Sequence, residues 1–369
     1  MSLKIFHTSD LHLGMKFAGY PEVQAELSEA RFKTFENLVS LANREKCDLF
    51  IIAGDLFDRV SIAKKDIIRT SKILQEFQGH LVAILPGNHD FISSDSTDLW
   101  LYFKENIHDN VVVLNEKKVY PLQHYDLDAH LYAAPCNSKQ SGENAIAWTK
   151  ESKKDGSVAH HIGVAHGSLE GFSPDFDQRY YPMSVSELQK CGLDIWLLGH
   201  THVQYPEKPG TEDRIFYPGT PEPDGFDCQH EGKAWIIEVD DDKKIHPASL
   251  STGTYKFLHE ELEVDSLSDL KMLRKRYASE DHRKVLLKLR LKGRLPRDEY
   301  ESLCEIRKPL EQQLFHLILN DDEVTEEITI DTINQEFTEG SFPHMLLTAL
   351  AHDSEALQIA YDLIKEVGR

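Results

Sequence analysis

The sequence predicts an α/β protein in which two β-sheets pack together and are flanked by helices, followed by a smaller α+β domain. Over the first 200 residues, short aliphatic runs alternate with helical stretches, as in strands that are buried on both faces. After residue 202 the runs are shorter and separated by turn residues. At 369 residues the chain exceeds a typical single core. A shift in composition near residue 255 therefore predicts domains at 1–255 and 256–369.

The strands and helices of the first domain follow from this pattern. We expect buried strands at 4–8, 49–53, 81–85, 161–165 and 195–198. Apolar residues at near-helical spacing predict helices at 21–46 and 63–78, and Pro21 stands where a first helical turn tolerates proline. Later runs at 214–217, 234–239 and 246–250 predict a meander that closes the second sheet against the first.

The second domain is expected to mix strands and helices. Its predicted strands are 257–262, 285–291 and 324–330, and its predicted helices are one beginning near Ser266, a long one at 297–317 and a final one at 354–367. In the strand at 285–291, leucines alternate with Lys288, Arg290 and, just beyond it, Lys292, which predicts a half-buried strand with a cationic outer row.

Composition narrows the functional classes. No apolar run approaches the roughly 18 residues that span a bilayer, and the first residues read as a strand, so we expect a cytoplasmic protein without membrane association. The five cysteines are scattered, which predicts reduced core residues. The net charge of -21 opposes nucleic-acid binding, but residues 271–297 hold eleven Lys/Arg against two acids. Bound divalent metals would add further positive charge.

Clusters of metal-ligand type follow the predicted strands directly. They are Asp10-Leu11-His12, Gly54-Asp55-Leu56-Phe57-Asp58, Gly87-Asn88-His89-Asp90, His166-Gly167 and Gly199-His200-Thr201-His202. Because ligands bind at the carboxyl ends of strands in open α/β sheets, these ends can converge on one point. Each cluster alone has an ordinary structural explanation as a turn or a cap, but their coincidence after five strands predicts a metal site.

The donor types and their number indicate which ions bind. Mixed carboxylate, amide and imidazole ligands suit Mn²⁺, Fe²⁺ or Zn²⁺ better than Mg²⁺, and we expect Mn²⁺ foremost. Seven donors exceed what one tetrahedral ion takes, so we expect two ions. Bridged by one carboxylate, two such ions lie ~3.5–4 Å apart and hold a hydroxide for in-line attack on phosphorus.

In this order the five clusters resemble the motifs of the calcineurin-like metallophosphoesterases, over about residues 1–240. The resemblance implies a four-layer αββα sandwich. It also implies that Asp10, His12 and His202 bind one ion, that Asn88, His166 and His200 bind the other, and that Asp55 bridges them. His89 would face the substrate and stabilise the transition state or protonate the leaving oxygen.

Two further acids have predicted supporting roles. The resemblance implies that Asp90 orients the imidazole of His89. Asp58 either supports the site from behind the ligands or is an acid at a helix N-terminus.

Three segments resemble the SbcD branch of DNA repair exonucleases: the sequences around Asp10 and around Asp55, and Tyr217-Pro218-Gly219-Thr220-Pro221. That resemblance implies a C-terminal capping domain that contacts DNA, an SbcC-like SMC-type ATPase partner and a homodimer. The segment 222–227 departs from the branch, because it is acidic where a neutral loop is expected.

Three functions remain open at this point. The first is a metal-dependent DNA exo/endonuclease that acts in double-strand break repair, with Lys288, Arg290 and Lys292 on the DNA backbone. The second is a phosphatase or phosphodiesterase for a nucleotide or another small phosphoester, with the second domain as a lid. The third is a weakly catalytic tether for DNA ends. A row of cations can also be a solvated strand face that discourages edge pairing.

Overall fold

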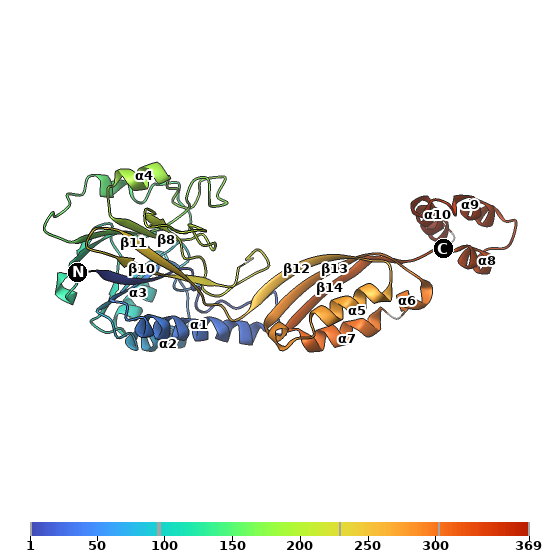
Figure 1. Cartoon of the computed structure of the whole chain (residues 1–369), viewed down its shortest axis with the longest axis horizontal. Helices are drawn as coiled ribbons and strands as arrows, with labels where there is room; N and C mark the ends of the chain where they lie inside the picture. Colours follow the sequence, from blue (N-terminus) through green and yellow to red (C-terminus); the bar gives the residue numbers. More distant parts are fainter. Residues whose placement is uncertain (1, 94–96, 229, 302, 368–369) are drawn as a thin grey trace. The chain divides into compact units, whose positions relative to one another are not determined.

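The computed structural model describes residues 2–93, 97–228, 230–301 and 303–367. Its contacts divide the chain into two compact units, Met1–Lys256 and Phe257–Arg369 (Figure 1). The sequence-based boundary at residue 255 lies one residue before this division.

The first sheet of the N-terminal unit has the strand order β11-β10-β1-β2-β3-β4. Its strands are β1 (Leu3–Thr8), β2 (Leu49–Ala53), β3 (Leu81–Leu85), β4 (Val111–Val113), β10 (Lys233–Val239) and β11 (Ile245–Ser251). The strands β1 to β4 are parallel, whereas β10 is antiparallel to both β1 and β11. The carboxyl ends of β1, β2 and β3 therefore share one edge.

The second sheet has the order β5-β6-β7-β8-β9. Its strands are β5 (Val119–Pro121), β6 (Ala129–Ala134), β7 (His160–His166), β8 (Ile195–Gly199) and β9 (Ile215–Phe216). All neighbours are parallel except β5, which pairs antiparallel with β6. Short 3-10 helices at Gln123–Tyr125 and Ala147–Lys150 connect its strands.

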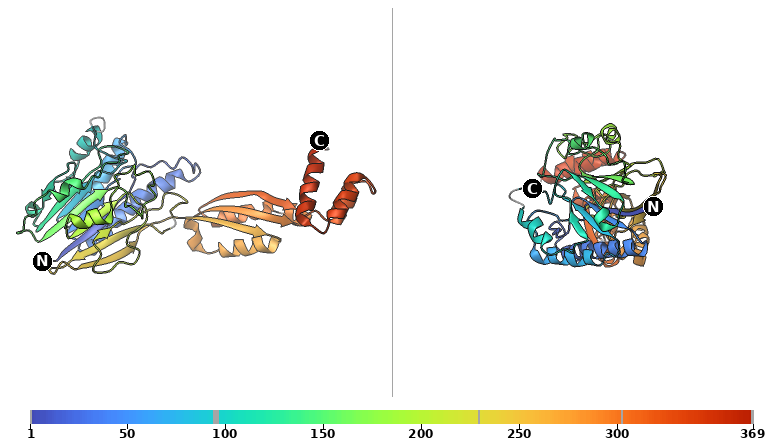
Figure 2. Two further views of the ribbon diagram at one scale, coloured as in Figure 1. Left: turned by 90° about the horizontal axis from the view of Figure 1, so that it is seen from above. Right: turned by 90° about the vertical axis from the view of Figure 1, so that its left-hand side faces the viewer.

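Four layers result from the alternation of side chains along the central strands. Phe6 and Phe50 of the first sheet pack against Phe35 on the helical side. The opposite face of that sheet packs on the second sheet, as Ile51 and Val164 do in one core. The helices are α1 (Gln24–Arg44), α2 (Lys64–Gln75), α3 (Thr97–Lys104) and, on the outer face of the second sheet, α4 (Val185–Lys190). Figures 1 and 2 show α1 and α2 on one side of the sheets and α4 on the other.

The predicted α/β class with two sheets flanked by helices is confirmed. The prediction that the meander at 214–250 closes the second sheet was wrong. Only the segment at 214–217 joins the second sheet, as β9, while β10 and β11 extend the first sheet beside β1. The second sheet is completed instead by β5 and β6. A short β5 and the alanine-rich β6 carry too few large apolar side chains to stand out in the sequence.

The C-terminal unit contains a three-stranded sheet in the order β12-β13-β14. Its elements are β12 (Lys256–Val264), α5 (Leu267–Arg276), a 3-10 helix (Glu280–Lys284), β13 (Val285–Leu295), α6 (Arg297–Glu301), α7 (Cys304–Gln313), β14 (His316–Glu326), α8 (Ile330–Glu336), α9 (Phe342–Leu350) and α10 (Ser354–Val367). Leu287, Leu289 and Leu291 are buried on the face that packs against the helices, as the alternation predicted. The final helix is also confirmed.

The predicted long helix at 297–317 was wrong. It is two helices followed by the start of β14, and Leu314 already has an extended backbone with ψ 160°. The buried Leu310, Leu314 and Leu317 continue at a helical spacing across this break, so periodicity could not reveal it.

Two composition-based predictions can be checked on the described residues. Cys47, Cys136, Cys191 and Cys228 are free and buried, as expected, while the side chain of Cys304 lies outside the described part of the chain. Among the residues with described positions, no helix is long and apolar enough to cross a membrane.

Candidate metal centre

The seven predicted ligands lie where the carboxyl ends of the two sheets meet. Asp10 and His12 follow β1, Asp55 follows β2 and Asn88 follows β3, all in the first sheet. His166 ends β7, and His200 and His202 follow β8 in the second sheet. Five strand ends from two sheets thus supply one cluster of side chains, which is the arrangement that the sequence predicted.

One group of donors consists of Asp10, His12 and His202, whose donor atoms lie within 4.8 Å of one another. The Nε2 atoms of His12 and His202 are 3.3 Å apart, and Nε2 of His202 lies 3.8 Å from Oδ1 of Asp10. This group is the set that the resemblance assigns to the first ion.

The second group forms around the side-chain oxygen of Asn88. Oδ1 of Asn88 lies 2.9 Å from Nε2 of His166 and 3.1 Å from Nδ1 of His200. Asp55 connects the two groups, because its Oδ2 lies 3.3 Å from Nε2 of His166 and 3.9 Å from Nε2 of His12. That intermediate place is the one a bridging carboxylate occupies.

The backbone of the ligand segments is strained. Asp10, His12, Asp55 and His200 all have a positive φ, at 55°, 45°, 54° and 102°. Such conformations cost of order 1–3 kcal/mol each in residues other than glycine, and they persist only where the surroundings enforce them. Backbone hydrogen bonds supply part of that enforcement, from Asp10 N to Gly54 O and from His12 N to Asp55 O, both 3.0 Å.

Two glycines permit the close approach of the ligands. A Cβ at Gly54 would lie 1.9 Å from Nδ1 of His166, and Gly54 also has a φ of 98°. A Cβ at Gly87 would lie 2.2 Å from Oδ1 of Asp55. Any larger residue at either position would displace a donor.

The cluster attracts positive charge. Asp10 and Asp55 are almost fully buried. Burial disfavours the imidazolium of His166, but the carboxylate of Asp55 outweighs it and raises the pKa of His166 to about 9. For His202 the opposing effect of burial is outweighed by the Asp224 carboxylate, and the pKa rises to about 9. His200 differs, since burial lowers its pKa to about 3.

The orientation of the imidazoles fits a metal centre. Nδ1 of His166 lies 2.8 Å from the carbonyl oxygen of Ala53, and because a carbonyl only accepts, Nδ1 donates and Nε2 is the nitrogen that can release its proton and bind a cation. Nδ1 of His202 faces Oδ2 of Asp224 at 3.2 Å, which likewise leaves Nε2 for the cluster. Such outer partners are typical of histidines that ligate metals. Two buried carboxylates, one amide oxygen and four imidazoles therefore suit a pair of divalent cations.

His89 lies beside the donors and lines the adjoining cleft. Its backbone N–H donates to Oδ1 of Asp55 at 2.8 Å, and its ring meets the His12 ring edge-on at 4.7 Å between centroids. Nδ1 of His89 donates to the carbonyl oxygen of Asp58, 3.0 Å away, so Nε2 is the atom that can exchange a proton with a substrate.

The predicted roles of Asp90 and Asp58 need correction. The carboxylate of Asp90 accepts the backbone N–H groups of Phe57 (3.0 Å) and Gly87 (2.7 Å), so it fixes the two ligand turns and does not orient His89. Burial, reinforced by Asp55, raises its pKa to about 7. Asp58 orients His89 through its backbone carbonyl, while its side chain pairs with Arg59. No helix starts at Asp58, since α2 begins at Lys64.

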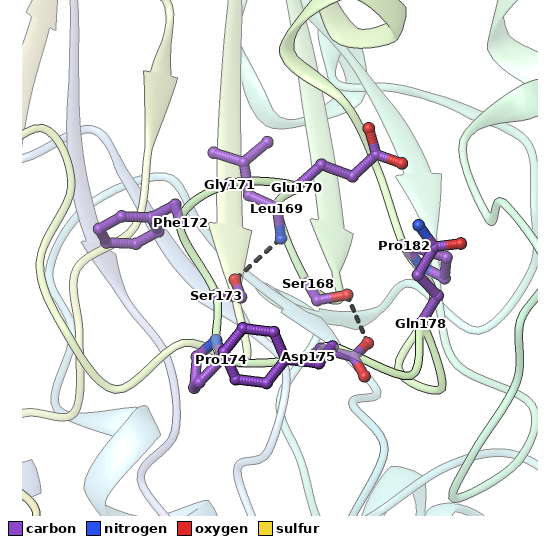
Figure 3. Close-up of a pocket in the computed structure, with 11 residues that line it drawn as sticks. Ser168, Leu169, Glu170, Gly171, Phe172, Ser173, Pro174, Asp175, Gln178 and Pro182 are labelled. Carbon is purple, nitrogen blue, oxygen red and sulfur yellow. Dashed lines mark hydrogen bonds between the residues drawn. The ribbon is translucent and has the colours of Figure 1, made fainter.

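A cleft of about 430 Å³ adjoins the donors. It is lined by Asn88, His89, Lys139, Ser173, Pro174, Asp175, Tyr180, His200, Thr201, His202, Val203 and Asp227. A neighbouring pocket of about 550 Å³ lies in the loop after His166 and shares Ser173, Pro174 and Asp175 with the cleft (Figure 3). Asp175 accepts from Ser168 at 2.8 Å, which holds this loop against the site.

The aromatic residues near the site differ in accessibility. Tyr180 is half-buried and its ring lies 4.9 Å from that of His200, beside the cleft. Phe17 and Tyr181 are buried, and the Tyr181 hydroxyl donates to Oδ1 of Asn137 at 2.7 Å. Stacking on nucleic-acid bases is therefore excluded for the rings of Phe17 and Tyr181 as they stand.

The predicted cationic row in the C-terminal unit is largely neutralised. Lys288 is exposed on β13. Arg290 pairs with Glu323 on β14 and lies 3.3 Å from Glu261 on β12, and Lys292 lies 2.9 Å from Glu261. The acids that pair with Arg290 and Lys292 stand on neighbouring strands, whose register could not be read from the sequence. The row is therefore not a bare cationic surface.

Sequence reasoning missed two residues that support the ligands. The guanidinium of Arg31, which is 1% exposed, donates to the carbonyl oxygens of Leu11 (2.6 Å), Asp10 (3.0 Å) and Glu222 (3.1 Å). Asp224 is the second. Their only sequence signals were a charged residue on the apolar stripe of a helix and the acidic departure at 222–227.

Comparison with known families agrees with this geometry. The sequence model of the calcineurin-like phosphoesterases matches residues 3–204, more than half of the chain. The chain belongs to the calcineurin-like phosphoesterase family. It is thus a metallophosphoesterase, a hydrolase of phosphoesters in a family that uses divalent metal ions.

Two relatives illustrate how far sequence similarity extends. The chain is 30% identical over 226 residues to the uncharacterised metallophosphoesterase YhaO of Bacillus subtilis, covering 59% of this chain and 52% of YhaO. It is 24% identical over 264 residues to the DNA double-strand break repair protein Mre11 of Methanopyrus kandleri, covering 66% of this chain and 52% of that protein. The chain thus spans about half the length of these relatives.

Solved structures resemble the chain only distantly. The protein TT1561 of Thermus thermophilus has a TM-score of 0.40 at 14% identity, over 67% of this chain and 99% of that one. The purple acid phosphatase PPD1 of yellow lupin has a TM-score of 0.43 at 12% identity, over 68% and 52%.

Proposed function

We propose that this metallophosphoesterase hydrolyses phosphodiester bonds of DNA as an exo/endonuclease of the SbcD type. The observation that carries the hydrolytic part is the convergence of seven metal donors in one cluster, with His89 beside them and a cleft adjoining it. Support for DNA as the substrate comes from a relative, since the similar protein from Methanopyrus kandleri is a DNA double-strand break repair protein.

The proposed ligand sets follow the observed groups. Asp10, His12 and His202 would hold one ion, and the groups around Asn88 the other, with Asp55 between them. When bound, the pair of ions supplies Lewis acidity toward the phosphoryl oxygens and a water-derived nucleophile at neutral pH. We propose Mn²⁺ as the ion, from the mixture of oxygen and nitrogen donors.

In this proposal His89 handles the proton of the leaving group. The carbonyl of Asp58 fixes the ring by accepting from Nδ1, and the backbone N–H of His89 is held by Asp55. Nε2 is then presented toward the cleft in a fixed direction. General acid–base catalysis by a positioned side chain contributes typically 10²–10⁴-fold.

A second candidate, a small phosphodiester such as a nucleotide, is favoured by one observation. Arg290 and Lys292, which were expected to contact a DNA backbone, form ion pairs with Glu261 and Glu323 instead. The overall charge of -21 acts in the same direction. A weakly catalytic tether for DNA ends is a third possibility.

The partners of the chain are also proposals. Similarity to the SbcD branch supports an SbcC-like SMC-type ATPase subunit and a homodimer. We propose a cytoplasmic location separately, because no apolar run in the sequence approaches the length that spans a bilayer.

The test compares three substrates in the presence of Mn²⁺: a labelled linear duplex, labelled single-stranded DNA and bis(p-nitrophenyl) phosphate. The variant His89→Gln removes the proton-transfer group, and His124→Gln, an exposed histidine outside the cleft, is the matched control. We expect His89→Gln to lose about 10²–10⁴-fold in rate on all cleaved substrates and His124→Gln to match the unaltered protein.

The outcomes separate the three candidates. Cleavage of DNA that His89→Gln loses supports the nuclease. Cleavage of the small ester alone overturns it in favour of the second candidate. Retention of metal and DNA binding without hydrolysis of any substrate overturns it in favour of a tether.

A further inference from the structure

We propose that Asp224 is a positioning residue for one metal ion, acting through His202. This inference rests on the proposed metal-dependent function and assigns a role to the acidic segment that departs from the expected pattern. The segment belongs to a loop, residues 220–228 and 230–232, which we call the acidic loop. It lies beyond residues 3–204, the part of the chain that the family model matches.

Asp224 contacts the face of His202 that points away from the cluster. Its Oδ2 lies 3.2 Å from Nδ1 of His202, and its side chain is only 11% exposed. A carboxylate accepts, so Nδ1 carries the hydrogen and Nε2 is directed toward Oδ1 of Asp10 and Nε2 of His12. Asp224 therefore selects both the tautomer and the ring orientation that ligation requires.

The same loop also holds the backbone of His202. Nδ1 of His230 accepts the N–H of Gly232 at 3.0 Å, so the hydrogen of the neutral ring is on Nε2, which donates to the carbonyl oxygen of His202. The N–H of Thr220 donates to that carbonyl as well, at 3.2 Å. His202 is thus fixed at its ring and at its main chain by one loop.

The acidic loop is in turn attached to Asp10, a ligand of the same group. The hydroxyl of Thr220 donates to the carbonyl oxygen of Asp10 at 3.0 Å. Arg31 bridges the carbonyl oxygens of Asp10 and Glu222, at 3.0 and 3.1 Å. The carboxylate of Glu222 accepts from the N–H groups of Thr254 and Tyr255 at 2.7 and 2.8 Å. These bonds give Asp224 a fixed support rather than the freedom of a surface acid.

The two donor groups differ in how their histidines are oriented. His166, in the group around Asn88, donates to the carbonyl of Ala53, which belongs to β2 and not to the acidic loop. His202 depends on Asp224. Loss of the Asp224 charge is therefore expected to weaken one ion and to leave the other in place.

The experiment titrates Mn²⁺ into the metal-free full chain by isothermal calorimetry and records the Mn²⁺ electron paramagnetic resonance spectrum. Asp224→Asn keeps the shape and removes the charge. Glu231→Gln, in the same loop but exposed and not among the residues that line the cleft, is the matched control. We expect Asp224→Asn to lose about 10–100-fold in affinity at one of two sites, with the spectrum of a coupled pair replaced by that of a single ion.

Asp224→Glu, which restores the charge, is expected to recover part of this affinity, and the far-ultraviolet circular dichroism of the metal-free protein should be the same for all variants. Two ions bound by Asp224→Asn with unaltered affinity would overturn the inference, as would an equal loss at both sites or in Glu231→Gln. Failure of the unaltered protein to bind metal would instead overturn the proposed function.

Discussion

The donor cluster of the N-terminal unit and the sheet of the C-terminal unit differ in how their charged side chains are buried and paired. At the donor cluster, Asp10 and Asp55 are buried and their near neighbours are imidazoles and backbone groups. On the β12-β13-β14 sheet, Arg290 and Lys292 are at least partly accessible and have acidic partners on adjacent strands. The first arrangement is costly unless cations bind, whereas the second is satisfied by itself.

Backbone geometry shows the same contrast. Four ligands with side chains adopt a positive φ at the cluster, while in β13 the residue with a positive φ is Gly293. Backbone strain at several side chains, together with buried ionisable groups whose pKa values are shifted, marks a functional site. Paired charges on an unstrained strand mark a structural surface.

Asp55→Asn is expected to have the largest effect, because it changes the donor cluster at its centre. Asp55 lies between the two donor groups, so an amide there removes the charge that both ions share. We expect the rate of bis(p-nitrophenyl) phosphate hydrolysis to fall about 10³-fold, which corresponds to a rise of about 4 kcal/mol in the activation free energy, and we expect bound metal to be lost. Asp48→Asn, outside the cluster, is the control, and an active, metal-loaded Asp55→Asn would contradict the role.

Gly54→Ala tests the strained, tightly packed geometry. The new Cβ would lie 1.9 Å from Nδ1 of His166, at a φ of 98°. Overpacking of this kind typically destabilises by about 1–3 kcal/mol, and a displaced His166 weakens metal binding. Urea unfolding and Mn²⁺ titration measure the two effects. Gly19→Ala, whose Cβ would meet nothing within 4 Å, should change neither.

His7 makes the buried interface between the sheets sensitive to acid. Burial lowers its pKa from 6.5 to about 3, so the folded protein keeps it neutral while the unfolded chain binds a proton below pH 6.5. Its contribution to stability is thus full above pH 6.5 and is lost as pH falls toward 3, with a slope of at most ~1.4 kcal/mol per pH unit. Urea unfolding of His7→Phe across this range should show a shallower decline, and identical slopes would contradict the assignment.

The smallest effect is expected on the sheet of the C-terminal unit. Glu261→Gln with Glu323→Gln releases Arg290 and Lys292 while leaving the melting temperature unchanged, because exposed ion pairs contribute little. If the row can contact DNA, the double variant should bind duplex more tightly and with a steeper salt dependence. Unaltered duplex affinity would remove the row from the proposed DNA contacts.

The sequence was most informative where function depends on residues next to strand ends. Asp10, Asp55, Asn88 and the later histidines could be recognised because each follows an apolar run, and parallel strands bring such ends together. The helical spacing of Leu310, Leu314 and Leu317 hid the break between α7 and β14, since buried leucines continue at that spacing from the helix into the strand.

Contacts between distant segments could not be predicted. Asp90 follows His89 directly, yet its carboxylate turns back to two backbone N–H groups, and a carbonyl at Asp58 orients the imidazole instead. Asp224 meets His202 only because the acidic loop folds across the cluster. Likewise, the partners of Arg290 depend on strand register, which alternation alone does not fix.

The most direct test of the two-ion centre is the rate of bis(p-nitrophenyl) phosphate hydrolysis by chelator-treated protein as Mn²⁺ is added. The geometry of the seven donors predicts no hydrolysis above background without metal and a rate that rises to its maximum only as the second ion binds. A rate that is independent of added Mn²⁺, or complete with a single ion per chain, would contradict it.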